Sequence, residues 1–219
     1  MRFPAILFDF DGTLVDSIHL IIESFHHTMR VHGLPAKSDA FWTEGLGTPL
    51  RVAFRPFAAD DAEVQRLIAT YREWNLAHHD GMVAAFPGAL DAVKDVRARG
   101  SRLAIVTSKN RHGLEKGLDL CGFHGLFDVL VTSDDLHASK PDPEPVRVAL
   151  RQLGAQPAQA LFVGDSPHDI AAGRDAGTVT AACLWGPFSR AQLAAERPDH
   201  WFESFTDLAR LTDGAAPRA

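Results

Sequence analysis

The chain has 219 residues, of which 46% are hydrophobic and 23% charged, a composition typical of soluble globular proteins. Its formal net charge of −6 gives no general reason to expect nucleic acid or an anionic membrane as a partner. No apolar run approaches the ~18 residues of a membrane span, and the first residues are too short and acidic for a signal peptide, so we expect a cytoplasmic protein. The two cysteines, Cys121 and Cys183, have neither metal-ligand nor disulfide-framework spacing.

Short aliphatic or β-branched runs predict buried strands in the chain. They lie at residues 5–9, 102–108, 128–133, 160–165 and 178–183. Amphipathic stretches between these runs predict helices at 87–100, 110–122, 143–154 and 167–177. Near-continuous apolar strands that alternate with helices are typical of a parallel sheet covered on both faces. The sequence therefore predicts a doubly wound α/β core.

One long stretch after the first strand breaks this alternation, because it contains no convincing strand before residue 87. Helical patterns begin after Asp16 or Ser17, surround PLRVAFRPF at 49–57, and continue over 60–74. We therefore expect an α-helical cap inserted after the first strand. The expected division is a core at 1–15 and 85–211, a cap at 16–84 and a flexible tail at 212–219.

Polar side chains follow the predicted strands at the points where the strands end. Ligands of a parallel α/β sheet bind beyond the carboxyl ends of its strands, so these side chains are expected on one rim. The set contains four carboxylates, two hydroxyls and one lysine: Asp9, Asp11, Asp165, Asp169, Thr107, Ser108 and Lys140.

Asp9 and Asp11 repel each other at the end of a buried strand, so a cation must offset that repulsion. Magnesium prefers oxygen ligands and is commonly held by one or two carboxylates together with water and substrate phosphate. We therefore expect a Mg²⁺ site formed by Asp9, Asp11 and Asp165. Asp169 suits a place outside the site, where it would orient Lys140 or a metal-bound water.

Each residue of the rim then has a predicted role in phosphoryl transfer. Asp9, at the strand end itself, is the predicted nucleophile and forms an aspartyl-phosphate. Asp11 points to the same side in extended geometry, so it is the predicted acid for the leaving oxygen and the base for the hydrolytic water. Lys140 balances the negative charge of Asp9 and of the transferring group. Three further positions are predicted to bind phosphoryl oxygens: Gly12, Thr107 and Ser108.

These motifs resemble, in the same order, the four motifs of the haloacid dehalogenase superfamily of phosphohydrolases. They are DFDGTLVDS at 9–17, the Thr107–Ser108 strand end, Lys140 in its proline-rich loop, and GDSPHDI at 164–170. The resemblance spans the whole core, and the helical insert is similar to the small α-helical cap of that family. It implies a Rossmann-like core, Mg²⁺ as cofactor and a small phosphorylated compound as substrate.

The exact substrate stays open at this point, with a phosphoglycolate phosphatase-like activity as the first interpretation and an inorganic pyrophosphatase as the alternative. Segments 45–51, 107–111 and 139–145 resemble phosphoglycolate phosphatases, whereas 71–80 together with 137–146 also looks like the related inorganic pyrophosphatases. A phosphosugar mutase would keep the same chemical groups. A phosphate-binding receiver module is disfavoured, because such modules lack the paired aspartates and the cap. A haloacid dehalogenase is disfavoured too, because its first motif has no second aspartate at the position of Asp11. Arg51 is the best cap candidate for a substrate carboxylate or second phosphate, although arginines at helix starts are often simply solvated. A monomer and a homodimer are both compatible with the sequence.

Overall fold

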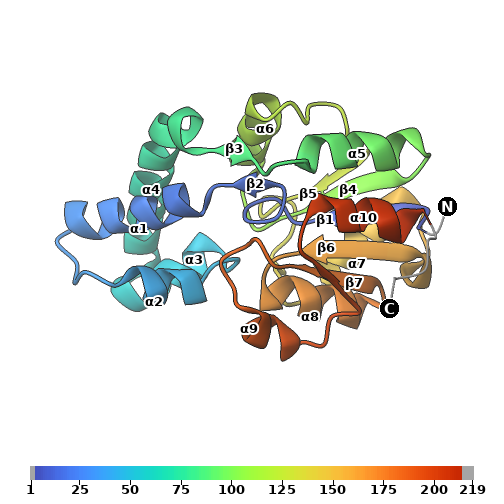
Figure 1. The fold of residues 1–219 in the computed structure, drawn as a ribbon. Coiled ribbons are helices and arrows are strands. Elements are labelled where there is room, and N and C mark those ends of the chain that lie inside the picture. The colour runs from blue at the N-terminus through green and yellow to red at the C-terminus, as the bar shows by residue number, and fades with distance from the viewer. Residues whose placement is uncertain (1–2, 214–219) are drawn as a thin grey trace.

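The computed structural model describes residues 3–213, so the predicted tail lies outside the described residues from 214 onward. The chain forms an α/β core and a separate group of helices beside it, as Figure 1 shows. The helical group interrupts the core in sequence after the first strand, as the sequence predicts. We call this group, from residue 18 to residue 82, the cap.

The core contains a six-stranded parallel sheet. Its strands are β1 (Ala5–Phe8), β4 (Arg102–Val106), β5 (Val129–Val131), β6 (Ala160–Gly164), β7 (Val179–Cys183) and β8 (His200–Phe202). They lie in the order β5-β4-β1-β6-β7-β8, with every neighbouring pair parallel. All five predicted strands are thus present, and β8 is an additional edge strand. The predicted α/β class is confirmed.

Helices cover both faces of the sheet (Figure 1). Successive residues of β1 alternate between the two layers, because Ile6 and Phe8 join one hydrophobic cluster and Ala5 and Leu7 the other. One layer contains α5 (Ala89–Ala98), α6 (Arg111–Leu120) and α10 (Phe205–Thr212); the other contains α7 (Glu144–Leu153) and α8 (Pro167–Ala176). Two short elements complete the core, η2 (Pro157–Gln159) and α9 (Arg190–Ala194). Within residues 3–213, no helix is both long and apolar enough to cross a bilayer.

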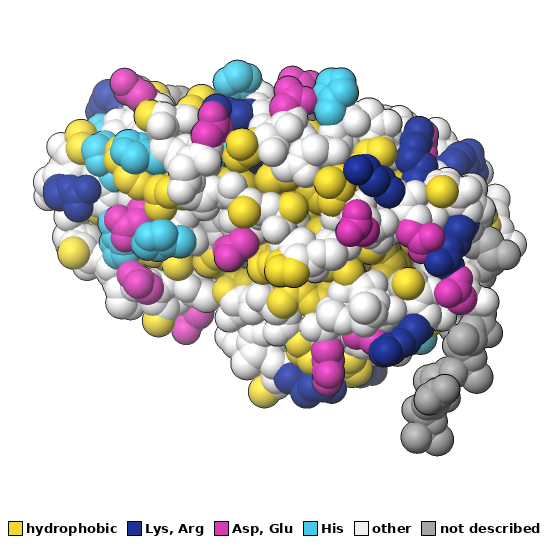
Figure 2. Space-filling model, turned by 45° about the horizontal axis from the view of Figure 1, so that its top comes forward, with side chains coloured by type: hydrophobic (Ala, Val, Ile, Leu, Met, Phe, Trp, Pro, Cys, Tyr) yellow, Lys and Arg dark blue, Asp and Glu magenta, His cyan; other side chains and the backbone are white. Residues whose placement is uncertain are grey.

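The cap has a hydrophobic cluster of its own. Its helices are α1 (Ile18–Val31), α2 (Asp39–Glu44), α3 (Leu50–Phe54), η1 (Arg55–Phe57) and α4 (Asp61–Met82). Phe25 stacks on Trp42 with ring centroids 4.2 Å apart, and Phe54 and Tyr71 pack against the same phenylalanine. Histidine side chains gather at the cap end of the face drawn in Figure 2. The hydrophobic cluster gives the cap a core of its own, separate from the two clusters that flank the sheet.

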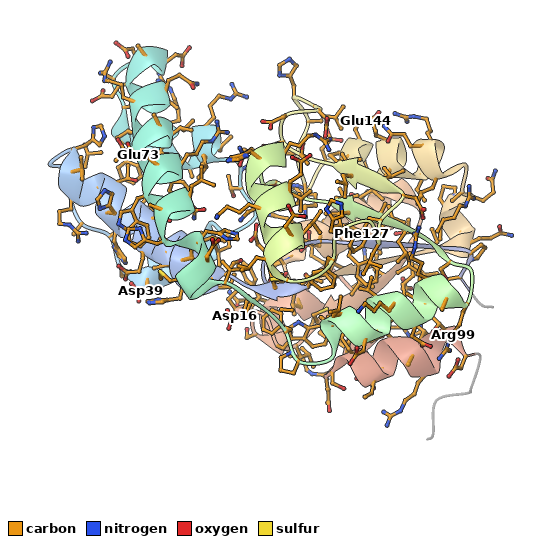
Figure 3. All side chains as sticks on the ribbon, turned by 90° about the horizontal axis from the view of Figure 1, so that it is seen from above. Asp16, Asp39, Glu73, Arg99, Phe127 and Glu144 are labelled. Carbon is orange, nitrogen blue, oxygen red and sulfur yellow. The ribbon has the colours of Figure 1, made fainter. Side chains whose placement is uncertain are left out.

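A two-stranded ribbon joins the cap to the core. Strand β2 (Val15–Asp16) pairs in antiparallel fashion with β3 (Ala84–Ala85). Asp16, labelled in Figure 3, lies where the cap helices meet the core. We expected no strand in this region from the sequence, and that expectation is wrong for these four residues. Two-residue strands are too short to show any periodic pattern.

Candidate active site

The carboxyl ends of four neighbouring strands bring predicted site residues together. Asp9 directly follows β1, Asp165 directly follows β6, and Thr107 directly follows β4. Lys140 lies in the loop that connects β5 with α7. Since these four strands are adjacent in the sheet, the side chains meet at one rim and line the same cavity.

Lys140 forms buried ion pairs at the centre of this rim. Its Nζ lies 2.7 Å from Oδ1 of Asp9 and 2.6 Å from Oδ1 of Asp169. It also donates to the backbone carbonyl of Val106 at 3.0 Å. Burial raises the pKa of Asp9 to about 7, although Lys140 opposes the rise. Burial disfavours the charged form of Lys140, but Asp169 and Asp9 outweigh this effect and raise its pKa. Lys140 is therefore held as a cation between two carboxylates.

Three buried carboxylates form an acidic group beside Lys140. Oxygen atoms of Asp9, Asp165 and Asp169 lie within 4.8 Å of one another. Burial raises the pKa of Asp165 well above its usual range, and the charges of Asp169 and Asp9 add to the rise. Three carboxylates facing one ammonium leave an excess of negative charge, which a divalent cation bound by oxygen would balance.

Two oxygens of this acidic group are open. Oδ1 of Asp9 pairs with Lys140, and Oδ1 of Asp165 accepts a hydrogen bond from the Thr13 hydroxyl at 2.6 Å. Over the described residues 3–213, no hydrogen bond occupies Oδ2 of Asp9 or Oδ2 of Asp165. Free carboxylate oxygens are the ligands that Mg²⁺ prefers, so the donor set fits this cation.

Asp169 contacts both Lys140 and the start of α8. Its Oδ2 accepts hydrogen bonds from the backbone N–H and the hydroxyl of Ser166, at 3.0 and 2.6 Å. The Ser166 hydroxyl in turn accepts from the N–H of Asp169, which completes a capping box. The start of α8 thus fixes the Asp169 carboxylate in place. The ion pair of this carboxylate with Lys140 is the contact that an orienting role would need.

Two glycines leave room around Asp165. A Cβ atom on Gly12 would lie 2.5 Å from Oδ2 of Asp165, and one on Gly186 would lie 2.8 Å from the same atom. Gly12 also has a φ of +84°, which favours glycine. Gly186 had no predicted role, because no sequence pattern relates the loop after β7 to the end of β6. The open oxygen of Asp165 therefore faces space that a side chain at either position would fill.

The Asp11 carboxylate lies outside the acidic group. Its two oxygens lie 2.9 and 3.1 Å from Nζ of Lys109, and Oδ1 also accepts a hydrogen bond from the Ser17 hydroxyl at 2.6 Å. The structure thus does not bring the Asp11 side chain to the other two predicted metal ligands, Asp9 and Asp165. Ser17 was expected only as a helix cap, and Lys109 had no assigned role although it stands in the segment after Thr107.

Thr107 and Ser108 connect the rim to the cap. The Thr107 hydroxyl oxygen accepts a hydrogen bond from the N–H of Lys109 at 3.1 Å. The Ser108 hydroxyl donates to the carbonyl of Gly47, in the loop between α2 and α3, at 2.6 Å. Both residues line the cavity. A cap loop therefore rests directly on a residue predicted to bind phosphate.

A cavity of about 350 Å³ lies between the rim and the cap. Its lining includes Arg51 of α3, the cap candidate named from the sequence, and also Arg72 of α4, which had no predicted role. Neither arginine forms an ion pair with another residue of the described chain. Besides Lys140 at the rim, the lining also contains Lys109, which pairs with Asp11. The cavity therefore combines an acidic rim with cations that could bind a second anionic group of a substrate.

The sequence of the chain matches one protein family over most of its length. Residues 6–183 match the haloacid dehalogenase-like hydrolases. The chain belongs to this family. The predicted membership is confirmed, together with the Rossmann-like α/β fold and its inserted helical cap.

Similar proteins carry phosphatase, pyrophosphatase and mutase names. Pyrophosphatase PpaX of Anoxybacillus flavithermus is 42% identical to this haloacid dehalogenase-like hydrolase over 214 residues, which cover 96% of this chain and 97% of that relative. A solved structure of a putative phosphoglycolate phosphatase from Lactobacillus plantarum has a TM-score of 0.85 and 27% identity, covering 96% of this chain and 100% of the other. A putative β-phosphoglucomutase from Bacteroides vulgatus has a TM-score of 0.82 and 27% identity, covering 95% and 87%. The prediction of a phosphatase of this family is confirmed by the pyrophosphatase relative and the phosphatase structure.

Proposed function

We propose that this hydrolase is a phosphatase that transfers the phosphoryl group of a small compound first to Asp9 and then to water. The observation that carries the proposal is the buried Asp9 carboxylate, which Lys140 fixes at the floor of the cavity beside Asp165. A carboxylate held in place next to a phosphoryl group is a competent nucleophile.

The chain supplies the groups for both halves of the reaction. In the first half an oxygen of Asp9 attacks phosphorus, the bond from phosphorus to the leaving oxygen breaks, and Asp11 protonates that oxygen. In the second half a water oxygen attacks phosphorus, Asp11 takes the proton of the water, and the bond to Asp9 breaks. Inorganic phosphate leaves and both carboxyl groups are restored. Lys140 stabilises the negative charge throughout, and three positions at the rim orient the phosphoryl oxygens: Gly12, Thr107 and Ser108.

Asp9 and Asp165 would hold Mg²⁺ through their open oxygens. The excess negative charge of the acidic group and the space beside Gly12 and Gly186 support a cation here. When bound, Mg²⁺ would neutralise phosphoryl charge and hold the group in line with the nucleophile. Asp11 lines the same cavity as Asp9, so it enters the proposal as acid and base. Its carboxylate pairs with Lys109, and its predicted role as a metal ligand stays a prediction.

The substrate is proposed to carry a second anionic group. Arg51, Arg72 and Lys109 line the cavity, and the first two have no ion-pair partner over residues 3–213. Pyrophosphate is the first candidate, because a relative with 42% identity over nearly the full length is named a pyrophosphatase. Phosphoglycolate is the second candidate, because a structural neighbour is named a putative phosphoglycolate phosphatase. Both combine a transferable phosphoryl group with another anion.

Phosphate release from a substrate panel tests the proposal. We expect pyrophosphate or 2-phosphoglycolate to exceed hexose phosphates in kcat/KM by about 10-fold or more, because only the former present a second anion to the cap. Chelation of divalent cations should abolish the activity, and added Mg²⁺ should restore it. Full activity in chelator would contradict the metal site, and equal rates on hexose phosphates would contradict the second anionic group.

Replacing Arg72 with alanine is expected to raise KM for the preferred substrate by about 10-fold or more, with a smaller change in kcat, because a charged hydrogen-bonding partner is lost. KM for p-nitrophenyl phosphate, which has no second anionic group, should stay the same. Arg66→Ala is the matched control, since Arg66 is an exposed arginine of the same helix outside the cavity lining. Equal KM changes for both substrates would show that Arg72 does not read the second anion.

We also propose the domain bounds predicted from the sequence. The cap domain spans 16–84, two residues more at each end than the helical group 18–82, and the core spans 1–15 and 85–211. The cap closes over the rim and excludes bulk water, and the Ser108–Gly47 hydrogen bond supports such a closed arrangement. Thr212 is the last residue of α10, at the proposed start of the tail. The enzyme is proposed to work in the cytoplasm as a monomer or a homodimer.

A further inference from the structure

The loop that carries the two catalytic aspartates is organised around Phe10. The carbonyl oxygen of Phe10 accepts hydrogen bonds from three backbone N–H groups, those of Thr13, Leu14 and Val15, at 3.3, 2.9 and 3.1 Å. Phe10 is fully buried and stands between Asp9 and Asp11. Any shift of this residue therefore moves the backbone on both sides of it, and with it the nucleophile and the acid.

The Phe10 ring is seated against α6 at Gly117. A Cβ atom at Gly117 would lie 2.8 Å from Cε1 and 2.9 Å from Cζ of that ring, closer than real Cβ atoms approach. The ring has no flexible end that could move aside, and the packed core around it resists displacement. Even alanine at this position would therefore have to push the ring, and the loop attached to it, away from the helix.

The cap reaches the same spot. Nε2 of His79, a fully buried residue of α4, lies 3.6 Å from the point that a Cβ on Gly117 would occupy. His79 is hydrogen-bonded through Nδ1 to Asp80 at 3.0 Å, and Asp80 pairs with Lys116 of α6 at 2.7 Å. Figure 3 shows this end of α4 beside α6. The ring of Phe10 thus sits where the catalytic loop, a core helix and a cap helix meet.

We infer that Gly117 is a positioning residue: its missing side chain seats the Phe10 ring between α6 and the cap, and this sets the place of Asp9 and Asp11. The inference rests on the proposed function for the roles of the two aspartates. It assigns a function in catalysis to a residue of a helix that contributes no side chain to the rim.

Gly117→Ala tests the inference through a split between kcat and KM. We expect kcat to fall about 100-fold, the scale of a 1 Å misplacement of reacting groups, while KM changes little because the cap cations are untouched. Helix propensity favours alanine over glycine, so weakening of the helix itself does not predict this loss. Gly81→Ala is the matched control: Gly81 is a helical glycine at the same end of α4, with no atom within 4 Å of its would-be Cβ. The kcat of the Gly81→Ala variant should equal that of the wild type.

Phe10→Leu provides the decisive background, because leucine lacks the two ring atoms that a Cβ on Gly117 would meet. In this background, adding Gly117→Ala should change kcat by less than about 2-fold, as expected when one residue acts through the other. The same 100-fold loss in both backgrounds would overturn the inference. If Gly117→Ala alone does not fold, a folded double variant with the kcat of Phe10→Leu supports the inference, and a double variant that also fails to fold overturns it.

Hydrogen exchange separates this inference from the proposed function. In Gly117→Ala the amides of Thr13 and Leu14, which donate to the Phe10 carbonyl, should exchange about 10-fold faster or more, whereas Gly81→Ala should leave them unchanged. Wild-type exchange in Gly117→Ala would overturn the positioning role whatever the activity. A wild-type enzyme that releases no phosphate from any substrate, combined with accelerated loop exchange in the variant, would refute the proposed function and leave the seating of Phe10 intact.

Discussion

Asp9→Asn is expected to lower kcat by about 10⁴-fold or more while the protein stays folded. Removal of a catalytic nucleophile has effects of this size, because an amide oxygen cannot form the covalent intermediate. The change keeps the shape of the side chain and removes one of three clustered carboxylates. Lys140 still has Asp169 as an ion-pair partner at 2.6 Å, so no buried charge is left alone.

Three measurements check the Asp9 prediction. Steady-state phosphate release gives kcat, circular dichroism and thermal unfolding show whether the fold is kept, and acid quenching with labelled substrate shows whether phosphate becomes attached to the protein. Asp16→Asn is the matched control, since Asp16 is an exposed aspartate of β2 outside the cavity. An Asp9→Asn enzyme with undiminished turnover, or with covalent phosphate at the wild-type level, would refute the nucleophile assignment.

The sheet could be predicted because its strands depend little on context. Strands buried on both faces need apolar residues at nearly every position, and β1, β4 and β6 have them in unbroken runs. Edge strand β8 lacks such a run: its sequence is His-Trp-Phe, and Trp201 is partly exposed under the guanidinium of Arg190, 4.4 Å from the ring centroid. Its strand conformation comes from pairing with β7, which only the folded chain provides.

The rim of the site could be predicted for a similar reason. The rule that ligands bind at the carboxyl ends of parallel strands needs only the strand ends, so it identified Asp9, Thr107 and Asp165 without any knowledge of loop conformation. Contacts across the cap–core boundary depend instead on how the insert docks. The Ser108–Gly47 hydrogen bond and the place of Arg72 in the cavity are of this second kind.

The Asp11 side chain shows the same limit within a single motif. Its spacing from Asp9 predicts that both carboxylates point to one side, and this led us to expect Asp11 as the acid and base beside the nucleophile. Gly12, with its φ of +84°, turns the chain immediately afterwards, and Lys109 and Ser17 bind the Asp11 carboxylate. Which partner a carboxylate finds is decided by tertiary contacts, which residue spacing does not contain.

Lys140→Ala is expected to impair both catalysis and stability, because one ammonium compensates two buried carboxylates. Lys140 is only 4% exposed and lies within 2.7 Å of Asp9 and of Asp169. Removing one partner of a buried ion pair costs about 3–5 kcal/mol of unfolding free energy. Loss of a cation that stabilises transition-state charge should lower kcat/KM by about 10³-fold.

The companion variant Lys140→Met separates charge from packing in this prediction. Methionine keeps an unbranched apolar stem and removes only the ammonium, so both variants should lose activity to the same extent if charge is what matters. Lys94→Ala on α5, outside the cavity lining, controls for the loss of a lysine as such. Urea unfolding gives the stability change and phosphate release the catalytic one. Wild-type activity in Lys140→Met would mean that the site binds the phosphoryl group without this ammonium. The charge of Asp9 would then have to be balanced by a bound metal cation alone.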